Sequence, residues 1–429
     1  MRIQLSKYIF ISCLIAFTSI VSHATVIDTT KVRITKKVKK TTAEIIGDIP
    51  GEILKLPFYI LDFSIEQITF HTPMKNVLSW IGTPRPAAFY TPVAGYNSSA
   101  GFKYGISFKF QDVYSKNDYF KTKIYYSTNK YQSYQIKTRS KDFFTKDFGF
   151  DFYFRYKKRP REDFFGVSNQ SVAHMSANYN LENTEVKTQL LYNAYEQADF
   201  SFILGYLSTN LYNGENPDLP GDLDSITSNT DYHLADGNLD DSRFITYGME
   251  IEYDLRNNKG QPSSGTHLIS QLIRYRGVGL SDDLRFSKYS IDVRQYLHLW
   301  KNRIIALRAV VNRLNAYKNN TKATPIYILS SLGGKDYLRG YSSGRFVDND
   351  FALFSVEYRY PIHDFLDLFL FHDQARVYGN LTDEEFFTNW KSSFGGGMRI
   401  WKSDEVKAVF QIGKSNEATK LYLEMEAVW

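Results

Sequence analysis

The chain has 429 residues, a formal net charge of +6 and a mean hydropathy of −0.36. Its only cysteine is Cys13, so the sequence excludes a disulfide scaffold and cysteine–zinc or thiolate chemistry beyond residue 24. No later stretch offers 18 consecutive apolar residues, which excludes helical membrane spans there.

Residues 1–24 are predicted to be a secretory signal peptide. Arg2 and Lys7 form a basic start, an apolar run follows, and Ser22-His23-Ala24 is a small-x-small cleavage site. The alternative is an uncleaved anchor. We therefore expect an exported protein.

Residues 25–97 are predicted to form a flexible basic tail and short amphipathic helices in the periplasm. The apolar residues of 58–68 recur at three- and four-residue steps, as on one helical face, and Thr72-Pro73 has the pattern of a helix start. These helices would act as a plug or docking element, or would pack against a barrel rim. Both readings stay open.

From residue 98 onward, apolar residues recur at every second position. Apolar residues alternate with polar or charged ones in the segments 102–111, 147–156, 244–254 and 354–360. The chain also holds 32 Tyr and 32 Phe. Transmembrane strands alternate in this way, and only a closed barrel satisfies their backbone groups in lipid. We predict an all-β fold over 98–429, a 16-stranded antiparallel outer-membrane barrel, with a soluble β-sandwich as the alternative.

The expected barrel has an even strand count, so both of its ends lie in the periplasm. Short turns would then face the periplasm, and the long loops 212–242 and 318–348 would lie outside. The sixteen expected strands are 100–113, 117–128, 130–139, 147–157, 169–180, 183–195, 198–211, 243–255, 264–276, 284–299, 303–317, 349–362, 366–378, 391–402, 405–414 and 419–429.

The last expected strand alternates up to the final residue. Tyr422 and Trp429 give it an aromatic character that resembles the signal by which outer-membrane barrels are delivered for insertion.

A loop segment within 332–341 combines two turns with a charge. Gly333-Gly334 precedes Leu338-Arg339-Gly340-Tyr341. An arginine between Leu338 and Tyr341 suits a loop that folds back into the protein, where a buried charge needs a partner.

This segment resembles the sixth extracellular loop of the BamA/TamA-type barrel superfamily, also called the bacterial surface antigen family. In that family the tetrapeptide folds into the barrel lumen. The resemblance extends to Phe371-His372-Asp373, to Glu357 and to a turn motif between the eighth and ninth strands. The matching turn residues are Asp254, Arg256, Pro262 and Gly265.

The resemblance implies that Arg339 forms a luminal latch. A carboxylate matches the guanidinium fork, so Asp373 is the first expected partner and Glu357 the second, with Phe371 beside Asp373. Gly395-Gly396-Gly397 would leave room for a loop backbone, or would mark a barrel kink. We expect Arg339→Ala to reduce heat stability far more than Arg345→Ala.

The sequence offers few groups for catalysis. It contains no HExxH and no Gly-x-Ser-x-Gly motif, so we expect no enzyme activity, no catalytic residue, no metal and no cofactor. The acidic loop 212–242 either binds calcium or is a solvated surface loop.

The resemblance implies a function in assembly or translocation. The barrel would insert or move protein or lipid at the outer membrane through a lateral seam between Ser99–Val113 and Lys420–Trp429, with Gly101 and Gly105 easing the opening. The alternative is a passive pore or a surface receptor.

The resemblance also implies partners. Expected ones are outer-membrane lipid, a protein or lipid client, and a periplasmic or outer-membrane assembly partner, but no nucleic acid. The pattern before the barrel lacks the alternation of POTRA domains, so we expect a barrel-only branch of the family.

Overall fold

The computed structural model describes most of the chain from Ala88 to Met425. The described residues are 88–97, 99–111, 118–145, 147–173, 176–195, 197–219, 239–317, 322–363, 365–381, 386, 388–402 and 405–425. The described residues do not include the predicted signal peptide, the predicted tail and helices up to residue 87, or Trp429. Among the described residues, no helix is both long and apolar enough to cross a membrane.

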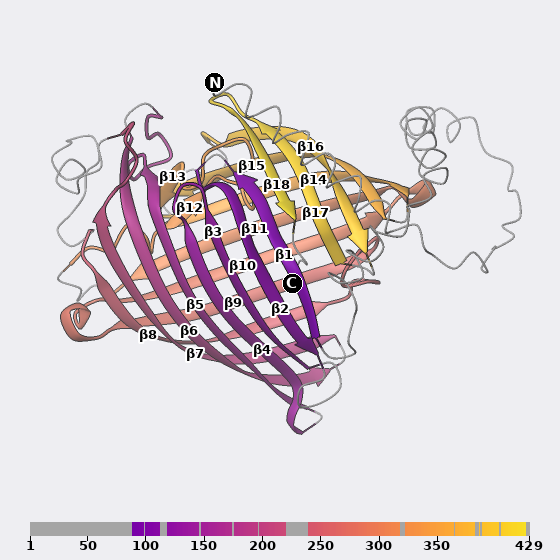
Figure 1. Ribbon diagram of the computed structural model, residues 1–429, viewed down its shortest axis with the longest axis horizontal. Coiled ribbons are helices and arrows are strands. Elements are labelled where there is room, and N and C mark those ends of the chain that lie inside the picture. Colours follow the sequence, from indigo (N-terminus) through magenta and orange to yellow (C-terminus); the bar gives the residue numbers. More distant parts are fainter. Residues whose placement is uncertain are drawn as a thin grey trace, which may run out of the picture.

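Sixteen of the described strands close into one antiparallel barrel (Figure 1). They are β1 (Ala88–Asn97), β2 (Gly101–Gln111), β3 (Tyr119–Ser127), β4 (Gln132–Thr145), β5 (Phe148–Phe164), β6 (Ala177–Tyr195), β7 (Ala198–Asn213), β8 (Ser242–Asp254), β9 (Gly265–Gly277), β10 (Arg285–His298), β11 (Ile304–Ala316), β14 (Asp350–His363), β15 (Leu366–Tyr378), β16 (Lys391–Lys402), β17 (Glu405–Lys414) and β18 (Thr419–Met425). The predicted fold class is confirmed.

Two short strands and two 3-10 helices complete the described elements. β12 (Ser330–Leu332) and β13 (Phe346–Asp348) pair in a separate small sheet within the connection from β11 to β14. The helices η2 (Gly279–Ser281) and η3 (Trp300–Asn302) lie in the β9–β10 and β10–β11 connections.

The period-two pattern accounts for the two faces of the wall. Tyr104, Phe202, Met249 and Leu370 are between 50% and 64% exposed on the outside. Their chain neighbours face the lumen, because successive side chains of a strand point to opposite faces. An apolar exterior of this kind matches the lipid-facing surface of a transmembrane barrel.

The count of sixteen arises from two errors in the expected strands that cancel. The expected first strand, 100–113, is β2, and a further strand, β1, precedes it, so the barrel begins at Ala88 rather than at residue 98. The expected strands 169–180 and 183–195 are one strand, β6. Pro92 lies inside β1 and weakens the sequence signal of a strand there.

The two barrel rims differ. The connections from β7 to β8 and from β11 to β14 lie at one rim, which we call the long-loop rim, and tight turns such as that between β14 and β15 lie at the other. At the long-loop rim the interior is filled by an apolar cluster that joins loop residues to the wall, and its most buried members include Leu332, Leu338, Tyr341, Phe346 and Leu353.

Candidate functional site

The segment 333–345 connects β12 to β13 and folds back against the inner wall; we call it the luminal loop. Its glycines take backbone conformations that other residues rarely adopt, with φ of +111° at Gly333, +83° at Gly334 and +96° at Gly340. The Gly334 N–H donates to the Tyr341 carbonyl at 3.1 Å, which closes the loop on itself. This geometry brings Arg339 to the wall.

Arg339 lies against Asp373 of β15. Its Nε donates to Asp373 Oδ2 at 2.8 Å, and its Nη2 donates to Oδ1 at 2.7 Å. The Arg339 backbone N–H donates to the same carboxylate at 3.2 Å. Arg339 is 8% exposed and Asp373 is fully buried. A two-pronged arginine–carboxylate pair of this kind fixes direction as well as distance.

Glu357 of β14 is the second carboxylate beside Arg339. It accepts from Arg339 Nη1 at 3.3 Å, from Arg359 Nε at 2.6 Å, and from both terminal nitrogens of Arg399 at 2.7 and 2.8 Å. Three arginines and two carboxylates therefore form one luminal network. The alternation Glu357-x-Arg359 places both side chains on one face of β14 and could have predicted the pairing.

Aromatic rings lie beneath two of these arginines. The guanidinium carbon of Arg339 is 3.4 Å from the centre of the Phe371 ring, and that of Arg399 is 4.0 Å from the centre of the Phe369 ring. Cations over aromatic faces are stabilised by the ring quadrupole.

The glycines of β16 make room for these rings rather than for the loop backbone. A Cβ at Gly395 would lie 2.6 Å from the Phe371 ring, and one at Gly397 would lie 2.7 Å from the Phe369 ring. The expectation of a loop backbone against Gly395-Gly396-Gly397 was therefore wrong.

The backbone of the luminal loop instead approaches β17. A Cβ at Gly413 would lie 2.8 Å from the Gly340 nitrogen, and one at Gly340 would lie 2.9 Å from the Lys414 carbonyl carbon. Close by, the Tyr341 hydroxyl donates to Asn416 Oδ1 at 2.6 Å. No sequence signal singled out Gly413, because its importance depends on a residue 73 positions away in the chain.

The luminal loop also contacts β18. The Tyr422 hydroxyl donates to the Tyr341 carbonyl at 3.3 Å, so this residue of the expected terminal signal points into the lumen. Lys335 Nζ lies 2.8 Å from Glu424 Oε1. Burial by itself lowers the pKa of Lys335, but the charges of Asp336 and Glu424 outweigh it and raise that pKa.

Arg345 is not a solvent-exposed counterpart of Arg339. It is 3% exposed, and its Nε and Nη2 donate to Glu417 at 2.7 and 2.9 Å. Its Nη2 also donates to the Ser171 carbonyl at 2.6 Å. Replacing Arg345 would leave Glu417, whose side chain is 26% exposed, without this partner, whereas replacing Arg339 would leave the fully buried Asp373 without its arginine. The expected larger effect of Arg339→Ala stays a prediction.

The β8–β9 turn lies at the opposite rim. Arg256 Nε and Nη2 each donate to Asp254 at 2.8 Å, and Pro262 is buried. Gly265 has a φ of +103°, and a Cβ there would lie 2.1 Å from the Leu255 carbonyl oxygen. The hydrogen bonds that Arg256 donates to Asp254 raise the pKa of Arg256, although burial opposes this. The four motif residues are thus part of one rigid turn.

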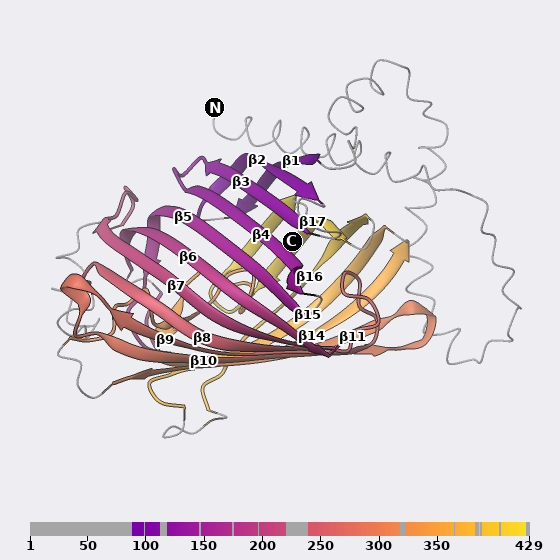
Figure 2. The same cartoon turned by 90° about the horizontal axis from the view of Figure 1, so that it is seen from below.

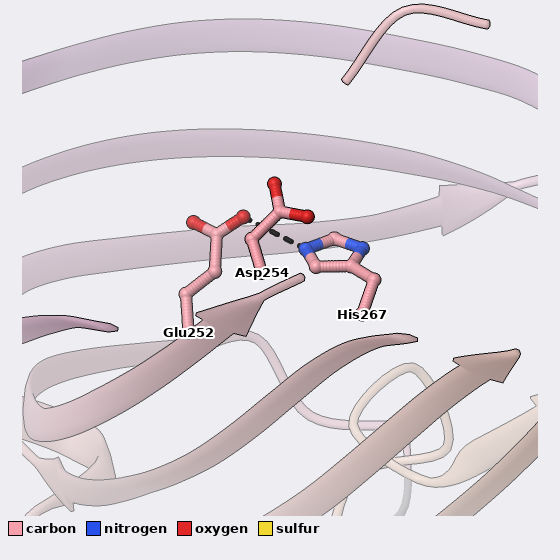
Figure 3. A group of neighbouring side chains, drawn as sticks. All are labelled: Glu252, Asp254 and His267. Atoms are coloured by element: carbon pink, nitrogen blue, oxygen red, sulfur yellow. Dashed lines mark hydrogen bonds and ion pairs between the residues drawn. The ribbon is translucent and has the colours of Figure 1, made fainter. Parts of the chain in front are cut away.

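Glu252, Asp254 and His267 come together beside this turn (Figure 3). Their donor atoms lie within 4.8 Å of one another, and His267 Nε2 is 2.8 Å from Glu252 Oε1. These residue types can ligate a divalent metal ion. Both Asp254 oxygens already accept from Arg256, which a metal ion would have to displace.

The barrel closes where β1 meets β18, which we call the seam. Among the described residues, which end at Met425, the two strands pair at Ala94–Met425, Gly95–Glu424 and Tyr96–Leu423. The expected seam strand Ser99–Val113 was wrong, because those residues belong largely to β2 and pair with β1 and β3. A Cβ at Gly105 would meet the β3 backbone at 2.1 Å, so Gly105 serves packing on β3.

The profile of the Omp85 superfamily domain matches residues 95–413 of this chain. Among curated proteins, none matches it. A similar solved structure is BamA from Haemophilus ducreyi lacking POTRA domains 1–3, with a TM-score of 0.56 and 16% identity. The match covers 79% of this chain and 70% of that one.

A second similar structure is CdiB from Escherichia coli, with a TM-score of 0.50 and 10% identity. That match covers 78% of this chain but only 62% of CdiB. At these identities the likeness concerns the fold.

Proposed function

Because this chain belongs to the Omp85 superfamily and is a bacterial outer-membrane β-barrel, we propose that it inserts or moves protein or lipid at the outer membrane through the β1–β18 seam. Barrels of this superfamily act as transporters and insertases. The clients would be protein or lipid, and a periplasmic or outer-membrane assembly partner would deliver them.

The observation that carries the proposal is the uneven pairing of β18 with its two neighbours. Over the described residues of β18, all of Thr419–Met425 pair with β17, but only Leu423, Glu424 and Met425 pair with β1. Pro92 has no N–H to donate, and prolines within sheets are confined to edge strands and bulges. Along this described stretch, fewer ladder hydrogen bonds join β18 to β1 than to β17, so the β1–β18 joint separates at lower cost than the β17–β18 joint.

The luminal loop supports an asymmetric opening. The part of the loop from Lys335 to Arg339 bonds to β14, β15 and β18, and to Arg308 of β11, which donates to the Asp336 carbonyl at 2.7 Å. At the end of the loop, Arg345 donates to Ser171 in the β5–β6 connection. On the other side, a cavity of about 260 Å³ separates the loop from Lys103, Lys157 and Arg159 of β2 and β5. We propose that Arg339 latches the loop to the C-terminal strands while β1 and β2 move.

A disulfide across the seam tests the proposal. Tyr96→Cys/Leu423→Cys joins residues in register on β1 and β18, in a Cys13→Ser background. The matched control, Met249→Cys/Leu272→Cys, joins residues in register on β8 and β9. Each pair is produced in the native host under oxidising and reducing conditions, and crosslinking is verified by mass spectrometry of the joined peptides.

The readout is the protein and lipid composition of the outer membrane. The locked seam should deplete at least one outer-membrane protein or lipid, a reductant should restore it, and the control lock should change nothing. An unchanged composition with a fully locked seam would refute the proposal. The passive-pore alternative predicts that the purified barrel conducts ions equally with the seam locked or reduced.

A further inference from the structure

Four arginines gather on the outside of β8, β9 and β10, and we call them the arginine patch: Arg243, Arg274, Arg276 and Arg285. In register, Arg276 lies opposite both Ile245 and Arg285, and Arg274 lies opposite Tyr247. Residues opposite each other in a ladder share a face. Ile245 and Tyr247 are more than 40% exposed on the outer wall, and all four arginines are exposed as well.

The arginine patch lies at the long-loop rim. Arg243 is the second residue of β8, Arg276 the penultimate residue of β9, and Arg285 the first residue of β10. Long loops mark the extracellular end of an outer-membrane barrel, so this rim meets the outer leaflet. Arg274 is two residues deeper, roughly 7 Å along the strand, and lies level with Tyr247.

Two features of the patch favour a bound anion. Arg276 and Arg285 are directly opposite across two strands, where like charges are destabilising. Within the described part of the chain, no carboxylate forms an ion pair with Arg243, Arg274 or Arg276. The cost of an arginine on the lipid face also rises with depth, which applies to Arg274.

Acidic residues near the patch belong to two connections: Asp240 and Asp241 directly precede β8, and Asp282 and Asp283 lie between β9 and β10. Asp282 is exposed and follows η2, and Asp283 lies beside it, two residues before Arg285. Asp240 forms an ion pair with Lys322, and Asp241 accepts a hydrogen bond from the Leu211 backbone N–H. None of these carboxylates forms an ion pair with Arg243, Arg274 or Arg276 within the described part of the chain, so these three exposed guanidinium groups can take up an anion.

We propose that the arginine patch binds the phosphate groups of an anionic lipid in the outer leaflet. The guanidinium fork matches phosphate with two parallel hydrogen bonds, and arginine stems can lie along apolar surface while their charged ends reach the head groups. The apolar residues beneath the patch, including Ile245, Tyr247 and Tyr289, would contact the acyl chains.

The position of the patch gives the bound lipid a mechanical consequence. β9 is eight strands from β1 in either direction around the barrel, so the patch lies directly across from the seam. In Figure 2, β9 and β10 lie on the opposite side of the barrel from β1. A lipid held there fixes this wall in the outer leaflet, whichever client the seam handles.

Native mass spectrometry of the purified full chain in detergent tests the proposal, with diphosphoryl lipid A and phosphatidylethanolamine as probes. The test variant is Arg274→Gln/Arg276→Gln. Lys130→Gln/Lys259→Gln is the matched control, because it removes the same charge from side chains that are 66% exposed elsewhere. Heat-modifiable gel mobility verifies that each variant is folded.

The full chain should bind lipid A in preference to phosphatidylethanolamine. Loss of two arginines should weaken lipid A binding roughly 30-fold, while the control pair changes it little. Arg274→Lys/Arg276→Lys should keep part of the affinity, because the charge remains without the fork. Equal binding by the two glutamine pairs would overturn the proposal, as would complete displacement of lipid A by millimolar inorganic phosphate, which would indicate a plain anion site.

Discussion

The seam and the wall across from it are built from the same kind of strand but differ in how they are joined. β8, β9 and β10 pair without interruption, from Phe244–Gly277 to Asp254–His267 and from Arg285–Arg276 to Tyr296–Gly265. No proline lies within these three strands. β1 contains Pro92, and of the described residues of β18 only Leu423, Glu424 and Met425 pair with β1, although all of Thr419–Met425 pair with β17.

This contrast shows how a closed barrel can hold one weak joint. Two paired strands separate only when their backbone N–H and C=O groups find other hydrogen-bond partners. The free-energy cost of separation therefore grows with the number of paired residues. The luminal network adds stability to β14, β15 and β16, on one side of the seam, and the arginine patch lies on the distant wall. Rigidity is thus concentrated away from β1.

Arg339→Ala should have the largest effect, because it leaves buried Asp373 with Ser355 as its remaining named donor, at 2.6 Å. Breaking a buried ion pair costs about 3–5 kcal/mol. The measurement is the temperature at which the purified barrel loses its folded gel mobility. Lys130→Ala, at a 66% exposed ion pair, is the control, and equal shifts for both variants would show that the network does not stabilise the C-terminal strands.

Gly413→Ala should have the second-largest effect on thermal stability. Its added Cβ would meet the backbone of Gly340 and Arg339 at 2.8 and 3.0 Å, and such overpacking costs roughly 1–3 kcal/mol. The same thermal assay applies. Lys414→Ala alters the exposed next residue of the same strand and should change stability by less than about 0.5 kcal/mol. Equal shifts for the two variants would contradict the close approach of the loop.

Hydrogen exchange sharpens the comparison without substitution. Amides of β1 should exchange at least about tenfold faster than those of β9, because local opening needs fewer broken hydrogen bonds at the seam. Mass spectrometry of peptides from the barrel in detergent measures both strands in one sample. Equal protection of β1 and β9 would remove the contrast on which the lateral opening rests.

Lys335→Ala should have the smallest effect. Lys335 and Glu424 are 35% and 39% exposed, and ion pairs of this kind contribute about 0–1 kcal/mol. A double-mutant cycle with Glu424→Ala isolates the pair. A coupling well above 1 kcal/mol would mean that the luminal loop holds β18 more firmly than exposed charges can explain.

The sequence predicted most of the strands but not which strands close the barrel. Strands such as β8 alternate so regularly that their faces follow from the residues alone. β1 was not predicted, because Pro92 and Gly95 interrupt its alternating pattern. β6 was predicted as two strands, because its middle, around Glu182-Asn183, is polar. The pairing of Arg339 with Asp373 followed from a resemblance and from guanidinium chemistry, whereas Arg399 joined the network without a sequence signal.

By itself, the sequence determined that this protein is a barrel and where its long loops lie, because the alternation of side chains along a strand is a local property. Only the tertiary structure decided which strand closes the barrel, that Arg345 pairs with Glu417, and that arginines of three strands form one patch. These depend on register between segments far apart in the chain. Register is set by the whole closed ladder, so no local pattern encodes it.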